Sequence, residues 1–390
     1  GPDGRRPSPQ PSLGHRSLSP AARLAQAQQG RRRRLPSVGK GPAGPGASAG
    51  GCLSSSPRGR RLPVRSGGAP PRGARPGSTA VVFSGEAFMV SGMMASREMV
   101  ARPAVKSMLQ TASAILGYNV RDTAFFGPDF LLAQPRYAMP ITFVLGMVAL
   151  DELRMAEQEA ADRVGCYSGQ GTGYITALCA AGVLTFEQGL RLVQARGEIV
   201  DEFASQVRQM VVWVVGLDMQ TAECLCAEAA VQAGPGSICE VACVYAHDRC
   251  WIAGTEKAVL AFRNMNGRQE GVFMSVMSLT YAPMTSLMLP LREKISDACA
   301  GILNSLKPPK HTVWSGSGPV AFRPGCDPKE IRDDLDDYLS SPLLWAPLVE
   351  AIRDVDGIYD FWELGHMKGL KGVMRSIDPV LYKRMKNIDL

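Results

Sequence analysis

Apolar and polar positions alternate in blocks that predict strands and helices in turn beyond about residue 80. Val81–Phe83 is a short apolar run typical of a buried strand. Residues 137–158 predict a long, mostly buried helix, and residues 185–206 predict an amphipathic helix with Thr185 as its N-cap. Between these helices, residues 162–184 predict a strand, a sharp turn and a helix. Strands that alternate with helices indicate a parallel sheet.

Residues 205–280 follow a different pattern. Their apolar runs predict strand, helix, strand, strand, helix and strand, which is the order of a ferredoxin-like unit. The alternation of strands and helices resumes at about residue 281, where residues 286–303 and 342–355 each predict a helix. We therefore expect an α/β protein with an α/β-hydrolase-like, parallel-sheet core at 80–204 and 281–390. A ferredoxin-like α+β subdomain at 205–280 would be inserted into that core.

Charge separates the first 80 residues from the rest. They carry fifteen Arg and Lys residues and one acid, a balance of +14, whereas the whole chain carries +7 and the remainder therefore −7. Residues 1–79 are rich in Pro, Gly, Ser and Arg, so we expect a disordered basic tail. An acid-poor, Arg-rich tail is typical of a plastid or mitochondrial transit peptide; a plain linker and an RNA-binding arm are the alternatives. The acidic remainder does not indicate a nucleic-acid-binding domain.

The remaining composition narrows the class of protein further. No run of about 18 uninterrupted apolar residues exists, so we expect no membrane span and a soluble protein. The ten cysteines lack the paired spacing of a zinc site, which predicts free thiols. We expect neither a metal nor a cofactor.

The stretch GCYSGQGTGYITALCAAG, residues 165–182, has the layout of a nucleophile elbow. In such an elbow a strand reverses sharply into a helix and carries the nucleophile at the apex. Gly169 and Gly173 suit a turn in which side chains would collide with the neighbouring backbone. The apex is Gly171, where a serine would be expected.

Further motifs flank the elbow along residues 80–380. They are Phe83-Ser84-Gly85-Glu86-Ala87 with Gly92-Met93, Ala133-Gln134-Pro135, the elbow Gly169-Gln170-Gly171-Thr172-Gly173-Tyr174-Ile175, Ala180–Leu190, Arg196-Gly197-Glu198, Ser341-Pro342-Leu343-Leu344-Trp345 and Glu363-Leu364-Gly365-His366. In this order the sequence resembles the malonyl-CoA:acyl-carrier-protein transacylase family, whose fold is shared by the acyltransferase domains of fatty acid and polyketide synthases.

The resemblance implies an S-malonyltransferase that uses malonyl-CoA, or another acyl-CoA, and acyl carrier protein. In the family a serine attacks the thioester, a histidine accepts its proton, and backbone N–H groups hold the oxyanion. The serine position is Gly171 and the histidine position is Met284, so the sequence offers no catalytic residue.

The resemblance also assigns four substrate-binding positions. Arg196 matches the arginine that pairs with the malonyl carboxylate, a task that suits a bidentate guanidinium. Glu86 and Thr172 would contribute oxyanion N–H groups. Gln134 belongs to the same set, although its place also suits the start of a helix.

Two functions stay open from the sequence. One is an S-malonyltransferase of fatty acid or polyketide biosynthesis; the other is a non-catalytic scaffold or assembly subunit that binds carrier protein or another partner. Loss of a serine nucleophile costs on the order of a millionfold in rate, which favours the second. Ser168 would serve as the nucleophile only if the elbow were shifted by three residues, which spoils the gapless match that follows.

Overall fold

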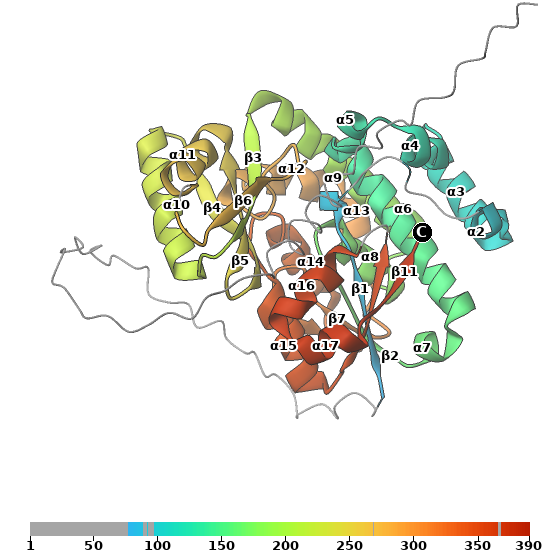
Figure 1. The fold of residues 1–390 in the computed structure, drawn as a ribbon. Coiled ribbons are helices and arrows are strands. Elements are labelled where there is room, and N and C mark those ends of the chain that lie inside the picture. Colours follow the sequence, from blue (N-terminus) through green and yellow to red (C-terminus); the bar gives the residue numbers. More distant parts are fainter. Residues whose placement is uncertain (1–76, 89–91, 93–96, 268, 366–367) are drawn as a thin grey trace, which may run out of the picture. The chain divides into compact units, whose positions relative to one another are not determined.

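A six-stranded sheet with the order β11-β10-β1-β2-β7-β8 forms the larger part of the fold (Figure 1). At its centre β1 (Thr79–Phe83) lies between β10 (Asp360–Gly365) and β2 (Val164–Gly169), parallel to both. All of β1 is buried, because helices cover both faces of a parallel sheet, and this explains its continuous apolar run. The outer strands are β11 (Lys386–Asp389), β7 (Thr312–Trp314) and the antiparallel β8 (Ala321–Phe322).

The computed structural model describes residues 77–88, 92, 97–267, 269–365 and 368–390. Most of the predicted basic tail, residues 1–79, lies outside the described residues. So do Met93 and His366, which belong to two of the motifs.

Long helices pack against the sheet. The predicted buried helix is α6 (Pro135–Ala156), which contacts α8 (Thr172–Ala180), α9 (Phe186–Gln206) and β10. Thr185 caps α9 in a full capping box with Gln188, as the sequence predicts. The other helices before the subdomain are η1 (Glu86–Phe88), α2 (Arg97–Ala101), α3 (Pro103–Leu116), α4 (Val120–Phe126), α5 (Asp129–Leu132) and α7 (Gln158–Asp162).

A second, five-stranded sheet has the order β6-β3-β5-β4-β9. The antiparallel order of its first four strands is that of a ferredoxin-like unit, and α10 and α11 pack on it around a small apolar core of their own. Together with the parallel sheet, this arrangement confirms the predicted fold class. The elements are β3 (Gln209–Val215), α10 (Met219–Ala233), β4 (Cys239–Ala246), β5 (Arg249–Thr255), α11 (Glu256–Asn266) and β6 (Phe273–Val276).

The sequence interpretation misses some elements after residue 281. A single helix is expected over residues 286–303, but Pro290, which lacks an N–H, separates η2 (Ser286–Met288) from α12 (Leu291–Ala298), and α13 (Ala300–Leu303) follows. The predicted helix at 342–355 begins only at Trp345, because Leu343–Leu344 form β9 and pair in parallel with β4. The later helices are α14 (Pro328–Asp337), α15 (Trp345–Asp356), α16 (Gly369–Ile377) and the unpredicted α17 (Pro379–Arg384).

Candidate active site

The elbow is present between β2 and α8. Gly171 joins them with φ 53° and ψ −124°, a conformation that residues with side chains rarely adopt. This is the strained backbone expected at the apex of a nucleophile elbow. The turn therefore keeps the apex geometry, while the residue at the apex has no side chain.

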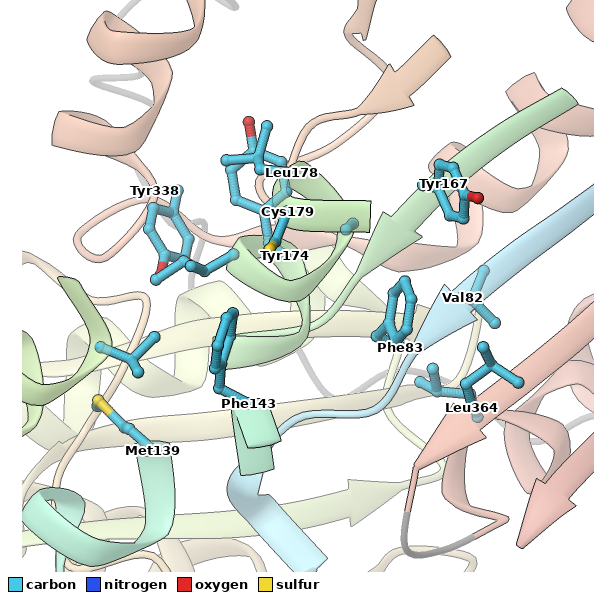
Figure 2. Packing of buried hydrophobic residues seen from close by; sticks show 14 of the residues in the cluster. Val82, Phe83, Met139, Phe143, Tyr167, Tyr174, Leu178, Cys179, Tyr338 and Leu364 are labelled. Carbon is cyan, nitrogen blue, oxygen red and sulfur yellow. The ribbon is translucent and has the colours of Figure 1, made fainter. Parts of the chain in front are cut away.

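The neighbouring glycines are required by close backbone contacts. A Cβ atom on Gly169 would lie 2.2 Å from the carbonyl carbon of Gly173, and one on Gly173 would lie 2.4 Å from the carbonyl oxygen of Phe83. Figure 2 shows Tyr174 of α8 in the buried cluster that surrounds the turn, together with Phe83 of β1. The strand can reverse directly into the helix because glycines at 169 and 173 avoid these collisions, as expected from the sequence.

The side chain of Glu86 fills the space beside the apex. Its Oε2 accepts a hydrogen bond of 3.0 Å from the backbone N–H of Thr172, and its Oε1 accepts one from the hydroxyl of Tyr281. A Cβ atom on Gly171 would lie 2.9 Å from the same Oε2. Glu86 is only 6% exposed. One of the two predicted oxyanion donors is therefore already bound to a carboxylate of the chain itself.

Met284, at the position of the family's histidine, lies beside the apex and Glu86. Gly171, Glu86, Tyr281 and Met284 all line one small cavity of about 10 Å³. Met284 is 3% exposed and has a φ of 61°, and its backbone N–H donates to the carbonyl oxygen of Leu339 at 2.7 Å. The fold thus brings Gly171 and Met284, the positions of the family's serine and histidine, to one cavity. The described residues that line this cavity include no Ser, Cys or His.

Arg196 is buried on α9 rather than exposed on its surface. Its guanidinium carbon lies 3.9 Å from the ring centroid of Tyr338, and its Nε has no hydrogen-bond partner among the described atoms. Burial lowers the pKa of the Arg196 guanidinium to about 10, although the nearby Tyr281 and Glu86 oppose this effect. A buried guanidinium with an unused N–H is suited to bind a carboxylate.

Two other candidates do not line this cavity. Gln134 is the N-cap residue of α6 and does not line the cavity. Ser168 lies within β2 with its hydroxyl 3.4 Å from the carbonyl oxygen of Trp314, and it is absent from the cavity lining as well. Gln170, next to the apex, donates its side-chain amide to the hydroxyl of Tyr245.

The tyrosines of the site were not singled out from the sequence. Tyr281 holds Glu86, Tyr245 holds Gln170, and Tyr338 lies under Arg196. None of them belongs to a motif with a recognisable spacing. The only property that a sequence could indicate for them is burial of the ring. Buried aromatic rings occur in any protein core, so burial does not distinguish these tyrosines from core residues.

A buried carboxylate fixes the elbow helix to the end of β7. Asp334 of α14 accepts hydrogen bonds from the hydroxyl of Tyr174 at 2.6 Å and from that of Ser315 at 2.7 Å. Burial raises the pKa of the Asp334 carboxyl from 3.8 to about 6, despite these two hydrogen bonds. The folded chain therefore binds this proton more tightly than the unfolded chain does.

This proton makes stability depend on pH. The contribution of Asp334 to the free energy of unfolding should fall by about 2 kcal/mol as the pH rises from 4 to 6, since the raised pKa favours the folded state only at low pH. Asp334→Asn keeps one acceptor oxygen, and its NH₂ group can donate to the second hydroxyl, so this variant should fold and remove the fall. Urea unfolding of both chains at pH 4.5, 5.5 and 6.5 measures the difference. Parallel pH dependences would show that Asp334 does not titrate in this range.

The described residues contain no group of three or more His, Cys, Asp or Glu side chains that could hold a metal ion, and no helix among them is long and apolar enough to cross a membrane.

A parallel sheet whose strand reverses through a glycine-lined apex into a buried helix, with a ferredoxin-like insertion, defines the class of α/β acyltransferase folds.

Comparisons with known proteins show which family within that class the chain is similar to. The chain is 24% identical over 323 residues to the mitochondrial malonyl-CoA-acyl carrier protein transacylase of Homo sapiens, covering 81% of each chain. It is 28% identical over 302 residues to the malonyl CoA-acyl carrier protein transacylase of Salmonella typhimurium, covering 76% of this chain and 92% of that one. The solved structure of the transacylase from Coxiella burnetii matches with a TM-score of 0.69 and 25% identity over 80% of this chain and 93% of that chain. No family model matches the chain. These relatives and structural neighbours are malonyl-CoA:acyl-carrier-protein transacylases at modest identity, and they support assignment of the chain to that family.

Proposed function

We propose that this chain is a transacylase-family protein of fatty acid or polyketide synthesis that binds acyl carrier protein without forming an acyl-enzyme. The observation that carries this proposal is the position of the Glu86 carboxylate. It lies where a nucleophile on residue 171 would project, and it occupies the N–H of Thr172.

The chemistry of the site supports a non-catalytic role. Gly171 offers no oxygen to accept an acyl group, and Met284 offers no basic nitrogen to accept a proton. An oxyanion that developed beside the Glu86 carboxylate would meet a negative charge where the family's mechanism needs hydrogen-bond donors. A cavity of about 10 Å³ also leaves no room for a malonyl group.

The relatives support the proposed partner and the proposed location. Their names state that they act on malonyl-CoA and acyl carrier protein, and the human relative is mitochondrial. A chain that keeps their fold over most of its length, with a predicted transit peptide, is proposed to meet a carrier protein in the mitochondrion. A plastid address stays a prediction of the sequence.

An S-malonyltransferase is the second candidate, and Arg196 favours it. Its Nε is buried without a partner, as expected of a guanidinium that waits for a substrate carboxylate. On this alternative, the site would have to open and Glu86 would have to leave the Thr172 N–H.

Labelled malonyl-CoA separates the two candidates. We expect the full chain to show no acid-stable malonyl label, whereas the human relative under the same conditions becomes labelled. We also expect the chain to bind carrier protein saturably in isothermal titration. A stoichiometric ester, and above all one mapped to Ser168, would contradict the proposal and the assignment of Gly171 as the apex.

A further inference from the structure

A second concave surface lies away from the elbow, where β10, β11, α16 and α17 meet the end of α6. Its volume is about 690 Å³, within the range of small-molecule sites, and it shares no lining residue with the elbow cavity. Figure 1 shows α16 and α17 at the C-terminal end of the chain, close to β11. We call this surface the lysine pocket, after Lys368, Lys371 and Lys386, which line it.

The charge of the lysine pocket is opposite in sign to the net charge of the chain beyond residue 80. Glu157 is the only carboxylate residue among the described residues that line the pocket, against three lysines. Residues 368–390 carry six Lys and Arg residues and two Asp residues, a balance of +4, whereas the chain beyond residue 80 has a balance of −7. A concave basic surface on an acidic body concentrates anions.

Two of the lysines have ammonium groups that take part in no ion pair in the described part of the chain. The Nζ of Lys386 lies 5.1 Å from the ring centroid of Trp362, and the Nζ of Lys371 lies 6.0 Å from that of Tyr382. Contact with a ring face steadies an ammonium group but uses none of its three hydrogen-bond donors. These donors remain available to a ligand.

The framework beneath the lysines is rigid. Glu363 is fully buried in β10, and its carboxylate accepts hydrogen bonds from the backbone N–H groups of Leu370 at 2.9 Å and Lys371 at 2.8 Å. It also accepts one of 3.0 Å from the side-chain amide of Asn387 in β11. One carboxylate therefore ties the first turn of α16 to β11 and fixes the spacing between Lys371 and Lys386. A fixed spacing lowers the entropic cost of binding.

From this geometry we infer that the lysine pocket binds a small phosphate-bearing anion with at least two negative charges. Lysine ammonium groups bind phosphate as compact point charges. The volume exceeds that of one phosphate group, so a diphosphate fits the surface better than a monophosphate does. The diphosphate can be free, as in pyrophosphate, or part of a nucleotide such as ADP.

Titration calorimetry of the full chain with pyrophosphate, ADP and inorganic phosphate tests this inference. We expect saturable binding of a diphosphate at one site, at least tenfold tighter than that of monophosphate at equal ionic strength. Equal affinity for pyrophosphate and ADP would assign recognition to the phosphates alone, and tighter binding of ADP would add the nucleoside; both outcomes support the site.

Matched variants separate the pocket from the basic N-terminal residues, which attract anions as well. Lys371→Ala/Lys386→Ala should weaken diphosphate binding at least tenfold. The control Lys257→Ala/Lys294→Ala removes the same charge from α11 and α12, outside the pocket, and should leave the Kd within twofold. Thermal unfolding without ligand checks that both variants fold. Absence of saturable binding, or equal losses in the two double variants, would overturn the inference. Malonyl-CoA labelling does not report on this pocket, so its outcome is independent.

Discussion

The triple variant Gly171→Ser/Met284→His/Glu86→Ala should form a malonyl ester that the natural chain does not form. The apex backbone already has the strained conformation of a nucleophile, and Gly171 and Met284 already face one cavity. Removal of the Glu86 side chain opens that cavity and frees the N–H of Thr172 for an oxyanion. Since a missing serine nucleophile costs on the order of 10⁶ in rate, the gain should be readily visible. Labelled malonyl-CoA, acid precipitation and peptide mapping measure it.

Two partial variants show which change matters. Gly171→Ser/Glu86→Ala lacks the base and should be labelled about 10²–10⁴-fold more slowly than the triple variant. Gly171→Ser alone should remain unlabelled, because the new side chain meets the Glu86 carboxylate. If the single variant became labelled as fast as the triple variant, Glu86 would not block the site and the proposed function would lose its main support.

Gly169→Ala should lower the free energy of unfolding by about 3 kcal/mol or more. The added Cβ would lie 2.2 Å from both the carbon and the oxygen of the Gly173 carbonyl, and 2.7 Å from the nitrogen of Tyr174. These are backbone atoms of the turn itself and cannot move aside as a flexible side chain does. Urea unfolding monitored by tryptophan fluorescence gives the change.

Gly301→Ala provides the matched control for this loss. It lies in α13, and an added Cβ there would meet nothing within 4 Å. Its free energy of unfolding should stay equal or rise by up to about 1 kcal/mol, because alanine suits a helix better than glycine. Equal stabilities for the Gly169 and Gly301 variants would show that the elbow tolerates a side chain beside its apex and is looser than described.

The surroundings of the apex limit what the triple variant can recover. Figure 2 shows Tyr338 beside Tyr174 of the elbow helix, and the same Tyr338 lies under the guanidinium of Arg196. A Cβ atom on Gly316 would lie 2.6 Å from the ring of Tyr174. A side chain therefore cannot be added beside the elbow helix at this position by one substitution, and full recovery of family-like activity is not expected from the triple variant.

The sequence by itself determined the α/β class, the buried β1, the capping box at Thr185 and the glycine turn around residue 171. These features are local: burial gives β1 its continuous apolar run, amphipathic helices their period, and a tight turn its glycines. The motifs also located Arg196 and Met284 at the positions of the family's site.

Only the tertiary structure decided what these positions do. Glu86 and Tyr281 stand 195 residues apart in the chain, and β9 pairs with β4 about a hundred residues before it. No periodic pattern reports such contacts, because they depend on how separately formed elements pack together. For the same reason only packing could reveal that the carboxylate of Glu86, and not a substrate, occupies the N–H of Thr172.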